Sequence, residues 1–201
     1  MNAAAAISRA ADTTLDLIFR EARSHKAWRD RPVPRGLLQQ VVELAQAGPT
    51  ATNSQPMRIV FVESKQGKER LREALHPGNV AKMMSAPVTA IVTHDLEFHV
   101  HQARTFPHRD VASGYRADPA HAHDTALRNG TLQGAYMMLA ARALGLDIGP
   151  MSGFHNEVVD ATFFAGTSLR TNLLCNLGYA DHGDLLPRQP RLSFDEVCSW
   201  A

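Results

Sequence analysis

The chain has 201 residues, of which 44% are hydrophobic and 20% charged, a balance typical of globular proteins and unlike that of disordered chains. Lys and Arg total 21 against 20 Asp and Glu, and the net charge of +1 argues against nucleic acid or an anionic membrane surface as a partner. The two cysteines are too few for a secreted disulfide scaffold, and no apolar stretch approaches the length of a membrane span. We therefore expect one domain over residues 1–201, flexible at 1–11, with reduced thiols and a cytoplasmic location.

Hydrophobic periodicity in the first half of the chain predicts helices followed by strands. Apolar residues at helical spacing over Asp12–Glu21 predict a first helix that runs into RSHK. Pro34 begins a second helix, LLQQVVELAQAG, which Gly48 and Pro49 end. A polar loop, PTATNSQP, precedes RIVFVES, whose β-branched and aromatic residues predict a buried strand. KQGKERLREALH is predicted to be helical, NVAKMMSAP follows it, and the near-continuous apolar run VTAIVTH predicts a second strand.

One long helix dominates the second half. Asp95–Ala120 mixes aromatics, prolines and charges without a sustained period, and we interpret it as an irregular excursion over a site. Asp124–Gly145 carries apolar residues every three or four positions, and Gly145 suits a left-handed C-cap. IGPMSGF is predicted to turn, NEVVDATFF to form a short helix and TNLLCNLGYA to form an apolar strand. The alternation indicates an α+β or α/β sandwich.

Two polar clusters and one glycine-rich segment are candidate binding sites. The first cluster follows the first helix and is either a solvated helix end or a phosphate cradle: Arg23, Ser24, His25 and Lys26. A phosphate needs a second arm, which Arg188 and Arg191 of LPRQPRLS could supply. The second cluster is an ordinary polar turn or a ligand loop: Thr50, Thr52, Asn53, Ser54 and Gln55. GPMSGF is a tight turn or a loop whose backbone approaches a planar ligand.

Several common kinds of catalytic site are excluded. The MSG triplet lacks the first glycine and the preceding strand of a nucleophile elbow, which argues against a serine hydrolase. No GxGxxG follows a strand and no GxxxxGK[ST] is present, so the usual dinucleotide and nucleotide motifs are missing. His99 and His101, like His121 and His123, are spaced by two without a third ligand, and no metal site is expected.

Taken in order, RSHKAW, GPTATNSQP, ALGLDIGPMSGF and LPRQPRLSF resemble the nitroreductase family of flavoproteins. The resemblance is closer to the malonic semialdehyde reductase (3-hydroxypropanoate dehydrogenase) branch of pyrimidine degradation, through GNVAKMMSAPVTAIV, the FPH of Phe106–His108 and FFAGTSLRTNLLCNLGY. It covers nearly the whole chain after residue ten. It implies a nitroreductase-like α+β fold, a three-layer sandwich with a central, mostly antiparallel sheet flanked by helices. It also implies an intertwined homodimer with FMN at the interface and Asp124–Gly145 as the dimer core.

The resemblance also implies roles for individual residues. The family's amino-terminal motif, which holds the FMN phosphate and ribityl chain, falls on Arg23, Ser24, His25 and Lys26. The asparagine that hydrogen-bonds the flavin falls on Asn53, and the same wall continues through Pro49, Thr50, Ala51 and Gln55. The loop that faces the isoalloxazine ring falls on Pro150, Met151, Ser152 and Gly153, although many relatives carry an acidic residue at Ser152. In the tail, Arg191 is the preferred phosphate partner and Arg188 the second choice.

The implied reaction passes a hydride from NADH or NADPH to FMN and then from the flavin to an acceptor in the same space. For malonic semialdehyde, the carboxylate needs a cation and the nascent alkoxide needs an acid. The expected side chains lie in Asp95–Ala120: Arg104, His108, Arg109 and Arg116, with His108 and Arg109 as the catalytic candidates. The alternatives are a broad nitroaromatic or quinone reductase of the same fold and a flavin-binding protein without turnover. No ribose-reading residue separates NADH from NADPH.

Overall fold

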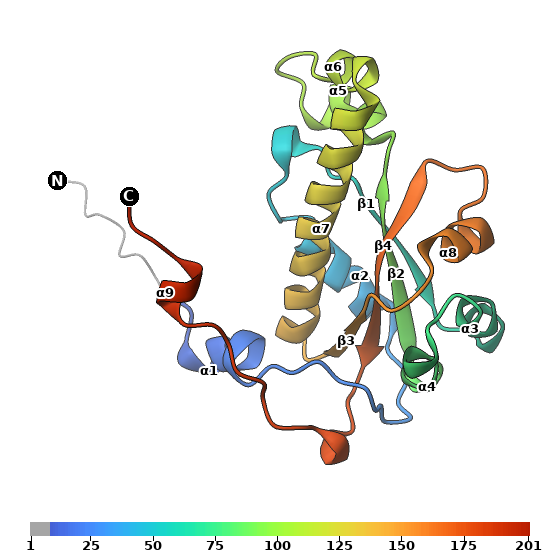
Figure 1. Ribbon diagram of the computed structural model, residues 1–201, viewed down its shortest axis with the longest axis vertical. Helices are drawn as coiled ribbons and strands as arrows, with labels where there is room; N and C mark the ends of the chain where they lie inside the picture. Colours follow the sequence, from blue (N-terminus) through green and yellow to red (C-terminus); the bar gives the residue numbers. More distant parts are fainter. Residues whose placement is uncertain (1–8) are drawn as a thin grey trace.

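The computed structural model describes residues 9–201, and its centre is a four-stranded sheet (Figure 1). The strands are β1 (Met57–Val62), β2 (Val88–Asp95), β3 (Asp147–Met151) and β4 (Leu169–Gly178), in the order β1-β2-β4-β3. Each neighbouring pair is antiparallel. Residues 1–11 are expected to be flexible, but positions 1–8 of this segment lie outside the described residues.

Helices cover both faces of the sheet and make a three-layer sandwich. One face carries α2 (Arg35–Ala45) and the long α7 (Pro119–Ala143); the other carries α3 (Lys65–Arg72), α4 (Pro77–Ser85) and α8 (Asn156–Phe163). The period of two in β2 divides the core, because Ala90 and Val92 pack toward α2 and α7 while Ile91 packs toward α3, α4 and α8. The predicted α+β sandwich with an antiparallel sheet is confirmed.

Short elements fill the remaining chain. They are α1 (Asp12–Leu15), η1 (Asp16–Arg20), η2 (Ala51–Asn53), η3 (Phe98–His101), α5 (Gln102–Thr105), α6 (Ala112–Ala117), η4 (His182–Asp184) and α9 (Phe194–Val197). The segment expected to be irregular therefore contains three short helical turns, which Phe98 and Tyr115 pack against the start of α7. α7 begins five residues before the predicted start, because Pro119 suits a first helical turn and Asp118 accepts a hydrogen bond from the His121 amide.

Two predictions about strands are wrong. β1 is an edge strand in which only Met57 and Val62 are buried, whereas the sequence predicts a buried strand. IGPMSGF is predicted to turn, yet its first residues form β3. Pro150 is tolerated there because β3 is the other edge of the sheet, where a missing N–H leaves no neighbouring strand unpaired. The strand predicted at VTAIVTH forms β2, whose residues are all buried, and the left-handed Gly145 after α7, with φ of 79°, is confirmed.

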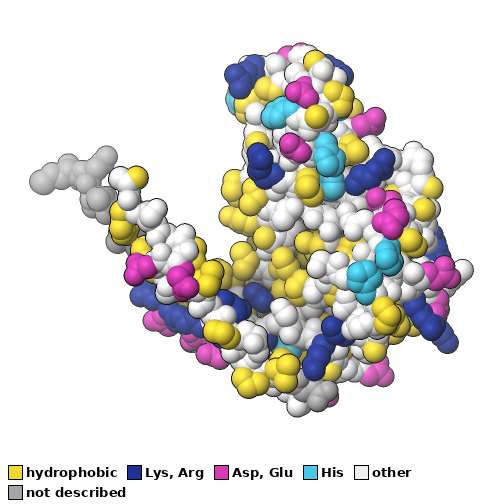
Figure 2. All heavy atoms as spheres, in the orientation of Figure 1, with side chains coloured by type: hydrophobic (Ala, Val, Ile, Leu, Met, Phe, Trp, Pro, Cys, Tyr) yellow, Lys and Arg dark blue, Asp and Glu magenta, His cyan; other side chains and the backbone are white. Residues whose placement is uncertain are grey.

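An apolar surface faces a projecting arm. We call residues 12–20 and 188–201 the terminal arm, because α1 and α9 project on the same side of the molecule (Figure 1), while η1 lies beside the end of α7, where the Ile18 carbonyl accepts a hydrogen bond from Arg142. Figure 2 shows hydrophobic side chains on the side of the body that faces this arm. The exposed apolar residues include three on α7 and several on the arm itself: Leu127, Leu132, Tyr136, Leu17, Phe19, Phe194, Val197 and Trp200. Exposed apolar surfaces of this kind are typical of interaction sites.

We expect the buried His94 to make the stability of the fold sensitive to acid. The side chain lies beneath α7, where Gly130 leaves room for it, and neither ring nitrogen has a hydrogen-bond partner among the described residues. Burial lowers the pKa of His94, helped by repulsion from His123 and Arg170 against opposing attraction from Asp160 and Asp95. A lowered pKa means that the unfolded chain takes up this proton first, so the free energy of unfolding falls as the pH drops below about 6.5.

We expect His94→Phe to reduce this acid sensitivity, because phenylalanine keeps the shape of the ring without the titration. Urea unfolding at pH 7.5 and 5.5 measures the difference, which for one proton is at most about 1.4 kcal/mol per pH unit. The control is His121→Phe, which replaces an exposed histidine on α7 and should keep the wild-type difference. An unchanged difference in the His94 variant would show that this side chain is not the source.

Candidate functional site

The predicted cationic cluster lies along the edge strand β3. The first helix ends at Arg20 instead of running into RSHK, and the following segment is extended. The His25 amide donates to the Ile148 carbonyl at 2.8 Å, and Ser24 forms an isolated bridge with Ile148. This pairing creates a pocket of about 240 Å³, lined by Arg23, Ser24, His25, Lys26, Lys82, Gly149, Pro150, Met151, Asn176, Leu185 and Leu186. Two of the predicted groups, residues 23–26 and 150–151, are thus brought together.

Glycine is required where these two segments meet. A Cβ atom on Gly149 would lie 2.4 Å from the carbonyl oxygen of His25 and 3.0 Å from Cζ2 of Trp28. The nearest of these atoms belongs to the backbone and cannot rotate away. The close approach of residues 23–26 to β3 therefore depends on Gly149 having no side chain.

The His25 side chain serves the fold of the pocket rather than its charge. It is buried, its Nε2 lies 3.3 Å from Oδ1 of Asp147, and its ring meets that of His182 edge-on at 5.1 Å. Burial lowers the pKa of His25, and His182 lowers it further, against the attraction of Asp147. The imidazole is therefore neutral at pH 7, and the positive charge of the pocket comes from Arg23, Lys26 and Lys82.

Among the described residues, the carboxyl-terminal tail lines the pocket through Leu185 and Leu186, and its Arg188 bonds to the segment that leads into the pocket. The Arg188 guanidinium donates to the carbonyl oxygens of Arg20 and Ala22, the latter at 2.8 Å. Arg23 in turn donates to the Leu186 carbonyl. Within residues 9–201, the hydrogen bonds of the Arg191 side chain go to the carbonyls of Gln189 and Pro190 in its own segment, at 2.9 and 3.2 Å. The second choice of the sequence analysis is thus the arginine that lies beside residues 20–26.

A network that the sequence analysis did not single out joins α4 to the glycine-rich loop. Lys82 Nζ donates to Asn79 Oδ1 at 3.1 Å, and Asn79 Nδ2 donates to the Gly153 carbonyl at 3.0 Å. A Cβ on Gly153 would lie 2.6 Å from this Asn79 nitrogen. The signal in the sequence is the spacing of three between Asn79 and Lys82, which places both on one helix face. The network fixes Lys82 in the pocket beside residues 150–153.

The predicted flavin wall, residues 49–55, is a strained loop. Thr52, Asn53 and Gln55 have positive φ angles of 49°, 50° and 45°, which residues other than glycine rarely adopt. The Ala51 amide donates to Asn129 Oδ1 of α7 at 2.8 Å, and Asn53 Nδ2 donates to the Thr105 carbonyl at 2.8 Å. Strain of this kind persists where surrounding structure fixes it, commonly at functional sites.

This wall lies apart from the cationic pocket within one chain. Gln55 and Ser54 line a different pocket, of about 590 Å³, together with Arg104 and Thr105. None of the residues 49–55 lines the 240 Å³ pocket. In Figure 1 the short cyan helix of this loop lies near the upper half of α7, whereas β3 lies at its lower end. One chain therefore does not unite the wall with residues 23–26 and 150–153.

The excursion that carries the catalytic candidates adjoins the wall. Its link is the hydrogen bond from Asn53 to Thr105, and the next rings, Phe106 and His108, meet edge-to-face at 5.5 Å. Arg109 and Arg116 line a third pocket of about 430 Å³, whereas Arg104 lines the 590 Å³ pocket. Within residues 9–201, these three arginines take part in no ion pair. The structure separates them between two pockets instead of gathering them in one.

Residues 9–201 hold neither a metal-ligating cluster nor a membrane-spanning helix. Among those residues, no three His, Cys, Asp or Glu side chains gather closely enough to hold a metal ion. None of the described helices has the length and apolar character needed to span a bilayer.

Comparison with solved structures shows the same fold in other proteins. A nitroreductase-type protein from Bacillus subtilis superposes with a TM-score of 0.85 at 23% identity, covering 95% of this chain and all of that one. A second, from Exiguobacterium sibiricum, was solved in complex with FMN and superposes with a TM-score of 0.82 at 20% identity, covering 94% of this chain and 97% of that one.

Comparison of sequences identifies the family. A protein of Burkholderia lata, provisionally named an NADH dehydrogenase/NAD(P)H nitroreductase, is 53% identical over 186 residues, which are 92% of this chain and 95% of that protein. The model of the nitroreductase family matches residues 19–179, most of the chain and all four strands. The protein therefore belongs to the nitroreductase family.

Proposed function

We propose that the protein is an FMN-dependent NAD(P)H oxidoreductase that reduces malonic semialdehyde to 3-hydroxypropanoate. The observation that carries the cofactor is the cationic pocket between residues 23–26, α4 and β3. Family membership, the FMN in the Exiguobacterium sibiricum structure and the NAD(P)H in the name of the Burkholderia lata relative support the same reading. The carboxylate-bearing acceptor rests on the resemblance to the malonic semialdehyde reductase branch and on the free arginines of the excursion.

The residues of the pocket fit a flavin mononucleotide. A terminal phosphate carries close to two negative charges and is best held by several charge-assisted hydrogen bonds, which Arg23, Lys26 and Lys82 can donate. Ser24 adds a hydroxyl, and Arg188 lies next to the same segment. The bound flavin supplies the hydride chemistry of the reaction. The backbone of residues 150–153 would then border its ring.

A second copy of the chain would complete the site. The wall around Asn53 and the cationic pocket lie apart in one chain. The exposed apolar residues of α7 and the terminal arm would be shielded from water by a partner. A twofold symmetric homodimer covers both copies of this surface at once, because the same patch meets itself. We propose that α7 forms the centre of this dimer and that the wall of one copy meets the pocket of the other.

The first test of the function is an absorbance spectrum. The purified protein, supplied with FMN, should show flavin absorbance near 450 nm that NADH or NADPH bleaches without oxygen and that malonic semialdehyde restores. A protein that stays colourless after FMN addition would overturn both enzyme hypotheses. Restoration by a nitroarene or quinone but not by malonic semialdehyde would favour the broad reductase, which the nitroreductase name of the relative also suggests.

We expect Arg109→Ala to lower kcat/KM for malonic semialdehyde roughly 10- to 100-fold, because a charge-assisted hydrogen bond to the substrate carboxylate is worth about 1.5–3 kcal/mol. Turnover of a neutral quinone should change less than twofold. Arg72→Ala, at an exposed arginine paired with Glu69 on the opposite face of the sheet, is the control. His108→Ala tests the neighbouring candidate in the same assay. If both excursion variants keep bound flavin and full activity on malonic semialdehyde, the carboxylate is held elsewhere.

A further inference from the structure

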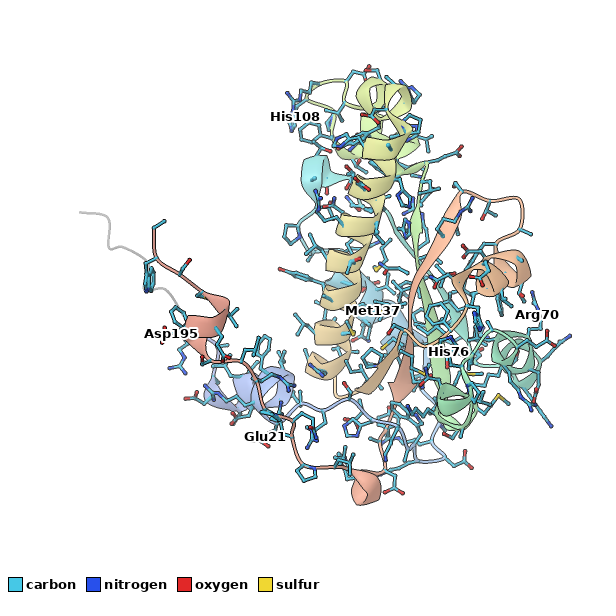
Figure 3. The ribbon with its side chains drawn as sticks, in the orientation of Figure 1. Glu21, Arg70, His76, His108, Met137 and Asp195 are labelled. Atoms are coloured by element: carbon cyan, nitrogen blue, oxygen red, sulfur yellow. The ribbon has the colours of Figure 1, made fainter. Side chains whose placement is uncertain are left out.

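Two histidines that no part of the proposed site uses lie side by side next to the glycine-rich loop. His76 precedes α4 as its N-cap residue, and His155 precedes α8. Their rings meet edge-to-face with centroids 4.9 Å apart. Both residues are exposed, and Figure 2 shows histidine side chains paired on this part of the surface, where Figure 3 places His76 beside α4. The sequence separates them by 79 positions, and only the fold brings them together.

Backbone pairing holds this pair against Gly153. The His76 amide donates to the Gly153 carbonyl at 3.0 Å, the His155 amide donates to the Ala74 carbonyl at 2.8 Å, and Leu75 forms a bridge with Phe154. A Cβ placed on Gly153 would lie only 3.3 Å from Nδ1 of His76. The imidazole of His76 therefore lies directly against the loop that the proposed function sets beside the flavin ring.

Charged and titratable groups of α4 and α8 lie near His76. His155 packs against its ring, and Nδ1 of His155 lies 3.6 Å from Oε1 of Glu157 on α8. Lys82 follows Asn79 by three positions on α4 and donates a hydrogen bond to its side chain. The exposed position of His76 lets it exchange protons with water after each turnover. Histidine is also the side chain best suited to proton transfer near neutral pH.

We propose that His76 is the acid that protonates the carbonyl oxygen of the acceptor, with His155 holding its ring in place. This inference rests on the proposed carbonyl reduction. The carbonyl carbon receives a hydride with its electron pair, and the π pair of the C=O bond moves to the oxygen. That oxygen bonds to the proton of the His76 imidazolium, which is left neutral and is reprotonated from solvent. NAD(P)H is the reductant consumed, and the aldehyde becomes the alcohol.

A quinone makes a different demand on the same site. Its reduced form is a weakly basic phenolate, whereas an aldehyde yields a strongly basic alkoxide that gains much more from a positioned acid. Loss of His76 should therefore slow aldehyde reduction and spare quinone reduction. His108 lies at the end of the molecule with α5 and α6, away from His76 in the same chain (Figure 3). His108→Asn and His76→Asn thus test two separate locations for the acid.

The experiment mixes reduced, FMN-loaded enzyme with malonic semialdehyde or 1,4-benzoquinone without oxygen and follows flavin reoxidation near 450 nm. We expect His76→Asn to slow reoxidation by the aldehyde about 100-fold, the lower end of general-acid effects, with the quinone rate changed less than threefold. The wild-type aldehyde rate should fall as the pH rises and His76 loses its proton, and this limb should be absent in the variant. His121→Asn, at an exposed histidine of α7, is the matched control, and His76→Gln replaces the first variant if that one loses flavin.

A second readout does not depend on turnover. In the oxidised, FMN-loaded protein, the histidine NMR signal that disappears in His76→Asn should change its titration when 3-hydroxypropanoate is added. An unmoved signal contradicts the proposal, as do equal slowing of both acceptors or no slowing of either. None of these results contradicts the proposal that malonic semialdehyde is the substrate. Enzyme that quinone reoxidises but no small aldehyde does would overturn the acid and the proposed substrate together.

Discussion

Replacing Gly149 with valine will empty the cationic pocket of its cofactor and destabilise the protein. The added Cβ would lie 2.4 Å from the His25 carbonyl oxygen, and the branched side chain would also meet Trp28. Because the first obstacle is backbone, the extended segment of residues 23–26 must move off β3, which breaks the hydrogen bond from His25 to Ile148. Overpacking of this kind costs about 1–3 kcal/mol in the free energy of unfolding. Displacement of Arg23, Ser24 and Lys26 should raise the FMN dissociation constant at least tenfold.

Urea unfolding and flavin fluorescence titration measure the two effects. Gly36→Ala is the control, since Gly36 has open space around it and lies in the first turn of α2. That substitution should leave FMN binding unchanged and raise stability slightly, by less than about 1 kcal/mol. Wild-type FMN affinity in Gly149→Val would mean that residues 23–26 do not hold the cofactor. Gly149→Ala should fall between the two, because one carbon already meets the His25 oxygen.

Removing Arg23 or Lys82 is expected to weaken FMN binding strongly without comparable loss of fold. Each cation can donate a charge-assisted hydrogen bond to phosphate, worth about 1.5–3 kcal/mol, so each alanine variant should raise the dissociation constant roughly 10- to 100-fold. Lys82→Ala should have the broader effect, because Lys82 also supports Asn79 against Gly153. Lys65→Ala, at the start of α3 and outside this pocket, is the matched control.

Riboflavin distinguishes a phosphate contact from a general defect. It carries the same ring system and chain without the phosphate, so Arg23→Ala should bind riboflavin as the wild type does. Raising the salt concentration should weaken FMN binding in the wild type more than in this variant, because screening acts on the charge that the variant has lost. Equal loss of affinity for FMN and riboflavin would show that Arg23 maintains the structure of the pocket and does not bind the phosphate.

Local patterns in the sequence predicted the layers well and the site only in pieces. The apolar runs of β2 and β4 and the periodicity of α2 and α7 were sufficient to identify these elements. Burial on one or both faces determines where apolar residues occur along a strand or helix. β3 was missed because Gly149 and Pro150 are typical of turns, and only pairing with the distant β4 makes that segment a strand.

The sequence does not show which of its motifs lie close together in space. The cluster at residues 23–26 and the wall at 49–55 were both identified, yet nothing in their order shows that one pairs with β3 while the other is fastened to α7 and α5. Arg188 and Arg191 are the same residue type in one short segment, and only the path of the folded tail shows which of them bonds to residues 20–22. Asn79 and Lys82 were overlooked because a polar helix face is ordinarily a solvated one. The pairing of His76 with His155 likewise depends on the backbone bridge between Leu75 and Phe154.

The cationic pocket draws on both ends of the chain, and this governs when it can exist during synthesis. Residues 23–26 leave the ribosome early, but β3 follows more than a hundred residues later, and the contact from Arg23 to Leu186 spans 163 positions. A nascent chain therefore has no complete cofactor pocket until Leu185 and Leu186 have emerged, and contacts of such long range form late in folding. Cofactor capture then has to follow the synthesis of these residues. A chain that stops before Leu185 should accumulate as a pale, flavin-free species even when its sheet has formed.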